Sequence, residues 1–291
     1  MNNTAWWIII FILILLILAA GEIFRETHTF RVRKYKVKTK KNIAIQNCVK
    51  VIFLSDLHNC VYGNKNDKLY KAIQAEMPDM ILIGGDMLVA KEGSSVQEAL
   101  EFVKKLPHIC QVYYTNGNHE QRMKENTDIY GDTYERYKAK LENCGVCFLE
   151  NKAENIEKNG MKFSIYGLEL DSSVNRKFKK ADVTEKTVEE KIGKKGKDYS
   201  ILMAHNPAYM DAYKKWGADL ILSGHLHGGL VRCPGIGAVV TPQGFLFPKY
   251  SGEMRREGEQ TIVVSRGLGS HTINIRLFNM PEVIAIEVCV R

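Results

Sequence analysis

The sequence contains no internal repeat and no low-complexity tract, which excludes a repeat architecture and a disordered chain. Its hydrophobic content of 45% is ordinary for a globular core. At 291 residues the chain has room for one large domain or two small ones. No convincing break in composition marks a second domain, so we expect one globular domain over residues 42–291.

The cysteines lack a spacing that would indicate a disulfide framework. There are seven, an odd number, and this agrees with a protein of a reducing compartment. Cys144 and Cys147 form one C-x-x-C pair, which is found in redox sites and in zinc knuckles. No second pair accompanies it, so we expect two buried small hydrophobic residues instead.

An excess of basic over acidic residues is confined to one short segment. The formal net charge is +8, but residues 22–41 hold eight Lys and Arg against two Glu. The rest of the chain has 33 basic and 31 acidic residues and is nearly neutral. A surface that binds the phosphate backbone of a nucleic acid is therefore not required by the composition.

Residues 1–21 carry no charge and include an apolar run from Trp6 to Ala20. With its flanks, this run reaches the roughly 17 residues needed to cross a hydrocarbon core. We predict a membrane anchor over residues 1–21. The alternative is a cleaved secretory signal, for which the small residues Ala19, Ala20 and Gly21 would suit the cleavage site. Residues 1–5 lack the positive charge that such signals normally carry, which favours the anchor.

The basic segment over residues 22–41 follows this span directly. It is predicted to be a juxtamembrane tether or an edge strand, and its charge would also attract anionic lipid head groups. All the Lys and Arg residues lie on the C-terminal side of the span, and such residues resist translocation. The expected product is a single-pass protein of the cell membrane whose globular domain is cytoplasmic.

Beyond residue 42, strand-like runs alternate with helical stretches. Helices are expected over residues 68–76, 96–105 and 133–144, and this alternation predicts α/β layers in which helices cover the faces of sheets. Two later apolar runs, over residues 261–265 and 283–290, suit strands that complete a second sheet.

Five of the buried strand-like runs end in side chains that bind metals. Such runs place the side chains that follow them along one edge of a sheet. Carboxylate, amide and imidazole groups are the ligands of divalent first-row metals. Any one of these residues alone would more often be a helix cap or a buried core histidine. Eight of them in this pattern predict a metal site, and they are Asp56, His58, Asp86, Asn118, His119, His205, His225 and His227.

The motifs that these residues form are similar to those of a known family. In order they are Asp56-x-His58, Gly85-Asp86, Gly117-Asn118-His119-Glu120, Ala204-His205 and Gly224-His225-Leu226-His227. Their order and spacing resemble the calcineurin-like metallophosphoesterase superfamily from about residue 49 to the C-terminus. The resemblance implies a four-layer αββα sandwich of two mixed sheets and a hydrolase of phosphate esters.

The resemblance also implies a role for each residue. Two divalent ions, Mn, Fe or Zn, would lie about 3.5 to 4 Å apart and activate a water molecule that attacks the phosphate. One ion would be held by Asp56, His58 and His227, the other by Asn118, His205 and His225, and Asp86 would bridge the two. His119 would act as general acid, kept protonated by Glu120. Neighbouring glycines would let the backbone approach the metals and the phosphate. Arg266, in a loop near the C-terminus, is a candidate for binding the substrate phosphate.

One branch of the superfamily fits poorly. Ser/Thr protein phosphatases continue the second motif as G-D-x-V-D-R-G, but here Lys91 closes a segment that lacks the Asp-Arg pair. The anchor and the segments over residues 224–229, 247–250 and 265–269 resemble membrane-associated phosphoesterases of the YkuE and YaeI type. Leu226 and Leu230 stand where relatives usually have Thr and Gln, so the substrate rim is expected to differ.

Three functions follow from these observations. The first is a metal-dependent phosphomonoesterase or phosphodiesterase that acts on a phosphorylated small molecule or lipid. The second, favoured by the anchor, is a pyrophosphatase acting on a lipid-linked or nucleotide-sugar diphosphate. The third is a protein-binding scaffold on the same fold, but scaffolds typically lose metal ligands and this chain keeps the whole set. Membrane lipid is the other expected partner, through the N-terminal helix and the basic segment.

Overall fold

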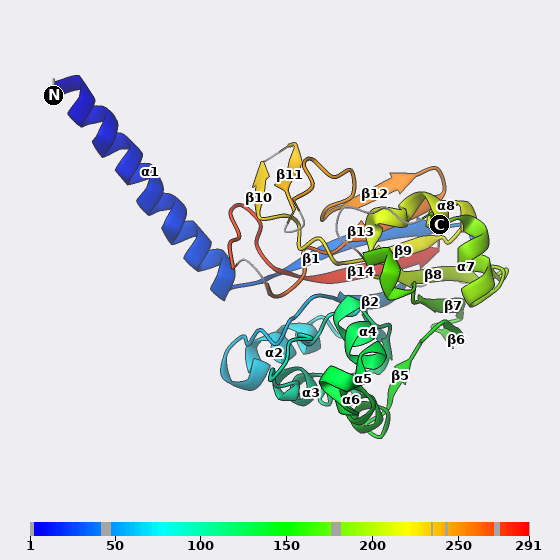
Figure 1. Ribbon diagram of the computed structural model, residues 1–291. Coiled ribbons are helices and arrows are strands. Elements are labelled where there is room, and N and C mark those ends of the chain that lie inside the picture. The colour runs from blue at the N-terminus through cyan, green and yellow to red at the C-terminus, as the bar shows by residue number, and fades with distance from the viewer. Residues whose placement is uncertain are drawn as a thin grey trace.

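The computed structural model describes residues 3–41, 48–175, 182–233, 235–241, 244–270 and 274–290. Two six-stranded mixed sheets form its centre (Figure 1). The first has the strand order β1-β14-β2-β3-β4-β5 and the second the order β12-β13-β9-β8-β7-β6. The predicted start of the domain, residue 42, lies outside the described residues.

The first sheet is built mostly from parallel strands, and β14 runs antiparallel to β2. Its central strands are buried on both faces, which is why they are continuous apolar runs in the sequence. The strands are β1 (Arg31–Thr39), β14 (Glu282–Val290), β2 (Cys48–Leu54), β3 (Met80–Ile83), β4 (Gln111–Tyr114) and β5 (Val146–Phe148).

The second sheet has a parallel centre with an antiparallel strand at each edge. It consists of β12 (Met254–Glu257), β13 (Gln260–Val264), β9 (Leu220–Ser223), β8 (Tyr199–Ala204), β7 (Met161–Leu168) and β6 (Lys152–Lys158). A separate two-stranded hairpin pairs β10 (Val231–Cys233) with β11 (Gly237–Val240).

Helices cover the outer faces and give the four layers predicted for the fold. The first sheet carries α2 (Asp67–Ala75), α3 (Gln97–Val103), α4 (Asn118–Glu125), α5 (Thr127–Tyr130) and α6 (Thr133–Glu142), and the second carries α7 (Glu185–Ile192) and α8 (Met210–Trp216). Short 3-10 helices lie at Asn64–Asn66, Leu106–His108, Ser172–Asn175 and Pro207–Tyr209. The three predicted helices correspond to α2, α3 and α6, and no end is shifted by more than two residues.

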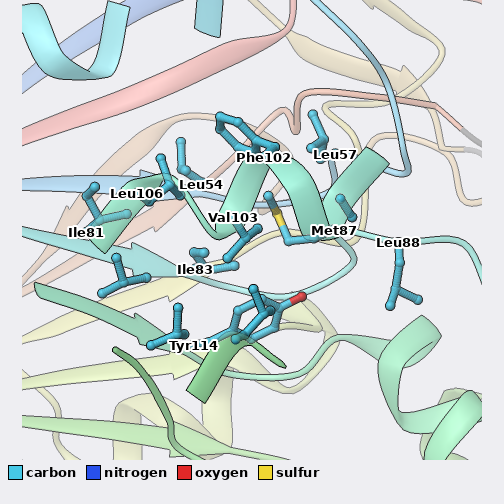
Figure 2. Packing of buried hydrophobic residues seen from close by; sticks show 14 of the residues in the cluster. Leu54, Leu57, Ile81, Ile83, Met87, Leu88, Phe102, Val103, Leu106 and Tyr114 are labelled. Atoms are coloured by element: carbon cyan, nitrogen blue, oxygen red, sulfur yellow. The ribbon is translucent and has the colours of Figure 1, made fainter. Parts of the chain in front are cut away.

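Three apolar layers hold the sandwich together. One lies between the first sheet and its helices, where Ile83 and Tyr114 of the strands meet Phe102 and Val103 of α3 (Figure 2). Another fills the space between the two sheets, and the third lies under α7 and α8. Met87, which directly follows Asp86, packs in the first layer, so the loops that bear the predicted ligands are anchored in the core.

The structure corrects one expectation about strands and decides between two alternatives for another. Residues 283–290 were expected in the second sheet, but β14 returns to the first sheet and inserts between β1 and β2. The basic segment was predicted to be a tether or an edge strand. It forms an edge strand, since Arg31–Thr39 pairs with β14 along its whole length. The first sheet therefore begins before the predicted domain start, and the division into anchor, tether and domain stays a prediction.

The expectation that the cysteines are unpaired is wrong for two of them. Cys48 and Cys289 face each other on the antiparallel strands β2 and β14 and form a disulfide. The pairing could not be predicted from the sequence, because the two cysteines are 241 residues apart and only the return of β14 beside β2 brings their thiols together. Cys144 and Cys147 are free and half-buried.

The N-terminal helix α1 spans Asn3–His28 and projects away from the sandwich (Figure 1). It is the one helix among the described residues that is long and apolar enough to cross a membrane. A signal sequence near the N-terminus would satisfy the same criterion.

Candidate metal centre

The predicted ligands follow the carboxyl ends of five strands, which meet at one edge of the sandwich. Asp56 and His58 follow β2, Asp86 follows β3, and Asn118 and His119 begin α4 after β4. From the second sheet, His205 follows β8, and His225 and His227 follow β9. Each sheet thus contributes part of one cluster, and the structure brings the eight residues together.

Strained backbone marks this edge. Five predicted ligands have positive φ angles: Asp56 (54°), His58 (48°), Asp86 (55°), His225 (70°) and His227 (51°). Residues other than glycine rarely adopt this conformation, and it persists where surrounding structure enforces it, often at functional sites. Here the enforcement is visible, because the loops after β2 and β3 are cross-linked by hydrogen bonds from Asp56 N–H to Gly85 O and from His58 N–H to Asp86 O, both 3.0 Å.

The first group of ligand atoms that could hold an ion consists of Asp56, His58 and His227. Oδ1 of Asp56 lies 3.8 Å from His58 Nε2 and 3.7 Å from His227 Nε2. The two imidazole Nε2 atoms are 3.3 Å apart. All three side chains are buried, and this arrangement has the carboxylate and imidazole donors that divalent first-row metals take.

The second group consists of Asp86, His205 and His225. Asp86 Oδ2 lies 3.2 Å from His205 Nε2. Asn118 joins this group, since its Oδ1 lies 2.7 Å from Nδ1 of His225. The buried Nε2 of His205 has no hydrogen-bond partner, and in the neutral ring its lone pair would be available to bind an ion.

Asp86 occupies the position between the two groups. The same oxygen, Oδ2, that lies near His205 is 3.8 Å from His58 Nε2. Its other oxygen, Oδ1, accepts a hydrogen bond of 2.8 Å from the backbone N–H of His119. Burial alone would raise the pKa of Asp86, but the charge of the neighbouring His205 outweighs it and holds the pKa well below its usual value.

Backbone carbonyls orient two of the imidazoles. Nδ1 of His205 donates to Gly84 O at 2.7 Å, and Nδ1 of His227 donates to Gly269 O at 3.0 Å. Because a carbonyl can only accept, each ring has its proton on Nδ1 and directs an unprotonated Nε2 toward the cluster when neutral. Such outer contacts fix the tautomer and the direction of a metal-binding histidine.

Without metal, the cluster holds opposite charges together. Burial, supported by the charge of Asp86, raises the pKa of Asp56 to about 6. Burial would lower the pKa of His205, but the carboxylates of Asp86 and Asp56 outweigh it and raise the pKa to about 10. The metal-free centre therefore keeps His205 protonated at neutral pH, and a cation that binds there must displace this proton.

The contacts of Glu120 differ from the role predicted for it. Its buried carboxylate accepts hydrogen bonds from the backbone N–H groups of Asp86 (2.8 Å), Met87 (2.9 Å) and Gly117 (3.0 Å) and from the hydroxyl of Tyr114 (2.7 Å). Burial together with the charge of Asp86 raises the pKa of Glu120 to about 7. These bonds make Glu120 the connection between the loop after β3 and the start of α4.

The ring of His119 is held by a backbone donor. Ala90 N–H donates to His119 Nδ1 at 2.8 Å, so Nδ1 is an acceptor and the ring proton lies on Nε2. His119 also belongs to a group with His58 and Asp86, which places it at the cluster. An imidazolium needs a proton on both nitrogens and would lose the bond from Ala90. The geometry therefore favours a neutral ring.

Close approach of the backbone explains two of the predicted glycines. A Cβ atom on Gly117 would overlap the carboxylate of Asp86, and one on Gly224 would overlap Ser55 and Asp56. Only glycine leaves room for these two carboxylates, which confirms the expectation that glycines let the backbone approach the site.

The structure connects Arg266 to other groups. Its Nε donates to Gly252 O at 3.0 Å and lies 3.7 Å from the buried Glu282. Burial lowers its pKa to about 10, although Glu282 acts in the opposite direction. This side chain is thus used within the fold, beside Gly228.

Sequence reasoning missed the groups that hold His227 in place. Arg276 is fully buried and donates to Gly269 O at 2.7 Å, the carbonyl that also accepts from His227. Nδ2 of Asn279 donates to the backbone oxygens of His227 (2.7 Å) and Gly229 (2.5 Å). Neither residue belongs to a spaced motif, so no pattern in the sequence would have identified them.

A cavity adjoins the second group. Asn118 and His205 line it together with Leu168, Leu170 and Val174, among others. A molecule bound there would meet apolar side chains next to the atoms that could hold an ion.

Comparison with known proteins identifies the family to which the chain belongs. The family model described as calcineurin-like phosphoesterase matches residues 49–229. The chain is 26% identical to an uncharacterised metallophosphoesterase, YkoQ of Bacillus subtilis, over 89% of this chain and 90% of that protein. It is 25% identical to the phosphodiesterase YaeI of Escherichia coli over 82% of this chain and 81% of that one. Among solved structures, the NAD nucleotidase of Haemophilus influenzae aligns with a TM-score of 0.47 and 14% identity, covering 77% of this chain and 46% of that one.

Proposed function

The chain belongs to the calcineurin-like phosphoesterase family and is a hydrolase acting on ester bonds, and from this premise we propose that it hydrolyses phosphomonoesters or phosphodiesters at a centre of two divalent ions. The observation that carries the proposal is the position of Asp86. One carboxylate oxygen faces His58 of the first group and His205 of the second, as a bridging ligand requires.

Asp56, His58 and His227 would hold one ion, and Asn118, His205 and His225 the other. The donor set of carboxylates, imidazoles and one amide suits Mn, Fe or Zn. When bound, the two ions would lower the pKa of a water molecule and neutralise the phosphoryl oxygens. The protein supplies oriented ligands, since Gly84 O and Gly269 O fix the rings of His205 and His227.

His119 would stabilise the reacting phosphate as a hydrogen-bond donor. Its Nε2 carries the ring proton because Nδ1 accepts from Ala90, so the ring can donate one hydrogen bond while neutral. This replaces the earlier expectation of an imidazolium acid kept protonated by Glu120. Glu120 instead positions the loop of Asp86 and the start of α4.

The test is metal content and activity measured on the same samples. Full chain reconstituted with Mn, Fe or Zn should bind two ions by elemental analysis. It should also hydrolyse members of a panel of aryl phosphates, cyclic nucleotides, nucleotide sugars and phospholipids. Hydrolysis with at most one bound ion would refute the two-ion centre, and two bound ions without any hydrolysis would favour the scaffold.

A second candidate is a pyrophosphatase that acts on a lipid-linked or nucleotide-sugar diphosphate. The observation that favours it is α1, which could hold the protein at a membrane. The same panel separates the two functions, because a pyrophosphatase would release two phosphorylated products from a diphosphate.

For localisation, we propose that α1 anchors the protein and that the domain is cytoplasmic. One-sided charge supports this side, with eight Lys and Arg following the span. The Cys48–Cys289 disulfide supports the opposite side, since disulfides persist in oxidising compartments. We give the charge more weight, because two facing thiols are also compatible with the strand pairing when reduced.

A further inference from the structure

Exposed large apolar side chains outside α1 are concentrated in one place. Nine of them are exposed among the described residues beyond that helix, and six lie in or next to the β10–β11 hairpin, in its turn and over residues 245–247 and 275–278. We name these six the apolar rim. They are between 41% and 68% exposed, and they are Ile236, Phe245, Leu246, Phe247, Ile275 and Phe278. Isolated exposed apolar residues are common, but six together usually mark a binding surface.

Backbone pairing joins the segments that carry the rim to one hairpin. Val231 of β10 bridges Leu277, and Val240 of β11 bridges Leu246. The segments that carry Phe245–Phe247 and Phe278 therefore lie on opposite sides of the β10–β11 hairpin, and Ile236 lies in its turn. Phe247 (φ 45°) and Phe278 (φ 57°) have left-handed backbones, which are uncommon for bulky residues.

The rim is attached to α1 by its own loop. Asn279, next to Phe278, donates its backbone N–H to Oε2 of the buried Glu26 near the end of α1, at 2.7 Å. Arg31 N–H, just after α1, donates to Pro281 O at 3.0 Å. In Figure 1, β10 and β11 lie at the same end of the domain as the C-terminal end of α1.

The metal centre lies at this end as well. Arg31 of β1 pairs with Glu282 of β14, and two residues further along β14, Ile284 pairs with Phe53 of β2. The carboxyl end of β2, which leads to Asp56, is therefore beside the start of β1. Asn279 completes the connection, since its side chain holds His227 O while its backbone holds Glu26.

We propose that the apolar rim enters the bilayer surface next to α1, so that the centre acts on phosphoesters of amphiphilic molecules that remain in that bilayer. This proposal rests on the proposed phosphoesterase function and on α1 as a membrane span. The occupant is lipid because the loop that carries Phe278 is hydrogen-bonded, through Asn279 and Glu26, to the helix that could cross a membrane. Aromatic and aliphatic side chains of this kind bind the boundary between head groups and acyl chains.

The substrate class follows from the same geometry. The β10–β11 hairpin, whose turn carries Ile236, starts at Val231, four residues after His227, so a head-group phosphate at the centre would be only a short stretch of chain from lipid-embedded side chains. A molecule with its acyl part in the bilayer and its phosphate at the interface would reach the centre without leaving the membrane. A fully water-soluble phosphoester would gain nothing from the rim.

Paired substrates test the proposal on the full chain in phosphatidylcholine vesicles. The vesicles would contain phosphatidic acid, a monoester, or phosphatidylglycerol, a diester, and p-nitrophenyl phosphate and bis(p-nitrophenyl) phosphate would be the soluble probes. We expect the triple variant Leu246→Ser, Phe247→Ser, Phe278→Ser to hydrolyse the lipid probe about tenfold or more slowly than the parent. A loss of this size corresponds to only part of the free energy gained by burying three large apolar side chains in lipid. On the soluble probes it should stay within about twofold of the parent.

The matched control is Met77→Ser with Ile129→Ser, two exposed apolar residues outside the rim. It should change neither rate. Equal losses of the triple variant on lipid and soluble probes, or no loss on lipid, would overturn the proposal. Hydrolysis of the aryl esters but of neither lipid by the parent would overturn it too.

A second measurement does not need activity. Phe247→Trp and Ile129→Trp would each be compared with the parent in vesicles containing brominated lipid. We expect additional fluorescence quenching for Phe247→Trp only. Equal quenching in both variants would refute insertion of the rim. A parent that hydrolyses no phosphoester would refute the proposed function, while the quenching result would still decide where the rim lies.

Discussion

The metal centre and the apolar rim depart from the usual distribution of residues in opposite directions, although both lie at one end of the domain. The centre buries carboxylates and imidazoles, and the rim exposes phenylalanine and leucine. Each departure lowers stability unless a ligand compensates for it: cations for the buried charges, and an apolar phase for the exposed rings. The two regions share one linker, Asn279, which contacts His227 and Glu26.

The comparison teaches that chemistry and substrate access can be separated. The centre should determine the rate on every phosphoester, whereas the rim should matter only for molecules in a bilayer. Variants in either region therefore make different predictions for soluble and membrane substrates.

The largest effect is expected for Asp86→Ala, which removes the carboxylate between the two ligand groups. Both ions should be lost, and turnover should fall roughly 10³- to 10⁴-fold on soluble and lipid substrates alike, because the ions supply several kcal/mol of charge stabilisation. Elemental analysis and rates on both probe types check this. Asp128→Ala, on the exposed surface of α5, is the control. Loss of a single ion would remove Asp86 from the bridging position.

The next effect concerns His119→Asn. We expect both ions to remain and turnover to fall by about 10² to 10³, the usual result of removing one donor that stabilises a transition state. Since the neutral ring donates a hydrogen bond without transferring its proton, the loss should be similar for good and poor leaving groups. Rates on a series of aryl esters of different leaving-group pKa measure this. A clearly larger loss for poor leaving groups would restore the acid role.

The disulfide lies on the far end of the sheet from both regions, so its removal should affect stability without touching either function. Oxidised protein should exceed Cys48→Ser in free energy of unfolding by about 2 to 4 kcal/mol, the typical contribution of a disulfide. Denaturant unfolding of both forms measures this, with Cys144→Ser as the control. The rates on aryl esters should stay unchanged.

The redox state of the same cysteine pair indicates on which side of the membrane the domain lies. Thiol trapping in intact cells should find Cys48 and Cys289 reduced if the domain is cytoplasmic, as the charge asymmetry predicts. A closed pair at the moment of trapping would place the domain on the oxidising side.

The sequence predicted the centre far better than the rim, for a physical reason. Asp56, Asp86 and His205 follow strands that are continuous apolar runs, and parallel strands must bring their carboxyl ends to one edge. The core layers and helices follow from similar local periodicity. Exposed residues such as Phe247 look like core candidates in a sequence, because hydrophobicity alone does not tell which side chains find partners.

Long-range placement was the other limit. Nothing local to residues 282–290 shows that this strand returns to the first sheet, so the β14–β2 pairing, the disulfide and the contact of Asn279 with Glu26 were all missed. Arg276 was missed for the same reason, since its partners lie on loops that only the fold brings together.

A smaller effect concerns metal affinity and pH. His205 has a pKa of about 10 in the metal-free centre, so its proton must leave before its Nε2 can bind an ion. Because this pKa is raised, protons compete with the ion for Nε2 of His205 at neutral pH, and this competition weakens as the pH rises toward 10. The dissociation constant of the ion held by His205 should therefore fall by up to about tenfold per pH unit between pH 7 and 9. Titration calorimetry in buffers of different ionisation enthalpy would count the released proton, and a pH-independent affinity would contradict this charge state.

The smallest effect is expected for Glu26→Ala, which breaks the contact between α1 and the rim loop and leaves the centre untouched. The backbone N–H of Asn279 would lose its partner, a change of about 1 to 3 kcal/mol if the group stays buried. We expect the rim to tilt away from the bilayer, so that hydrolysis of phosphatidic acid or phosphatidylglycerol in vesicles falls a few-fold while aryl esters react as before. Glu26→Gln keeps an oxygen acceptor and should behave like the parent. If Glu26→Ala instead slows hydrolysis of both substrates equally, the contact between Glu26 and Asn279 also positions His227. The rim and the metal centre could then not be altered separately.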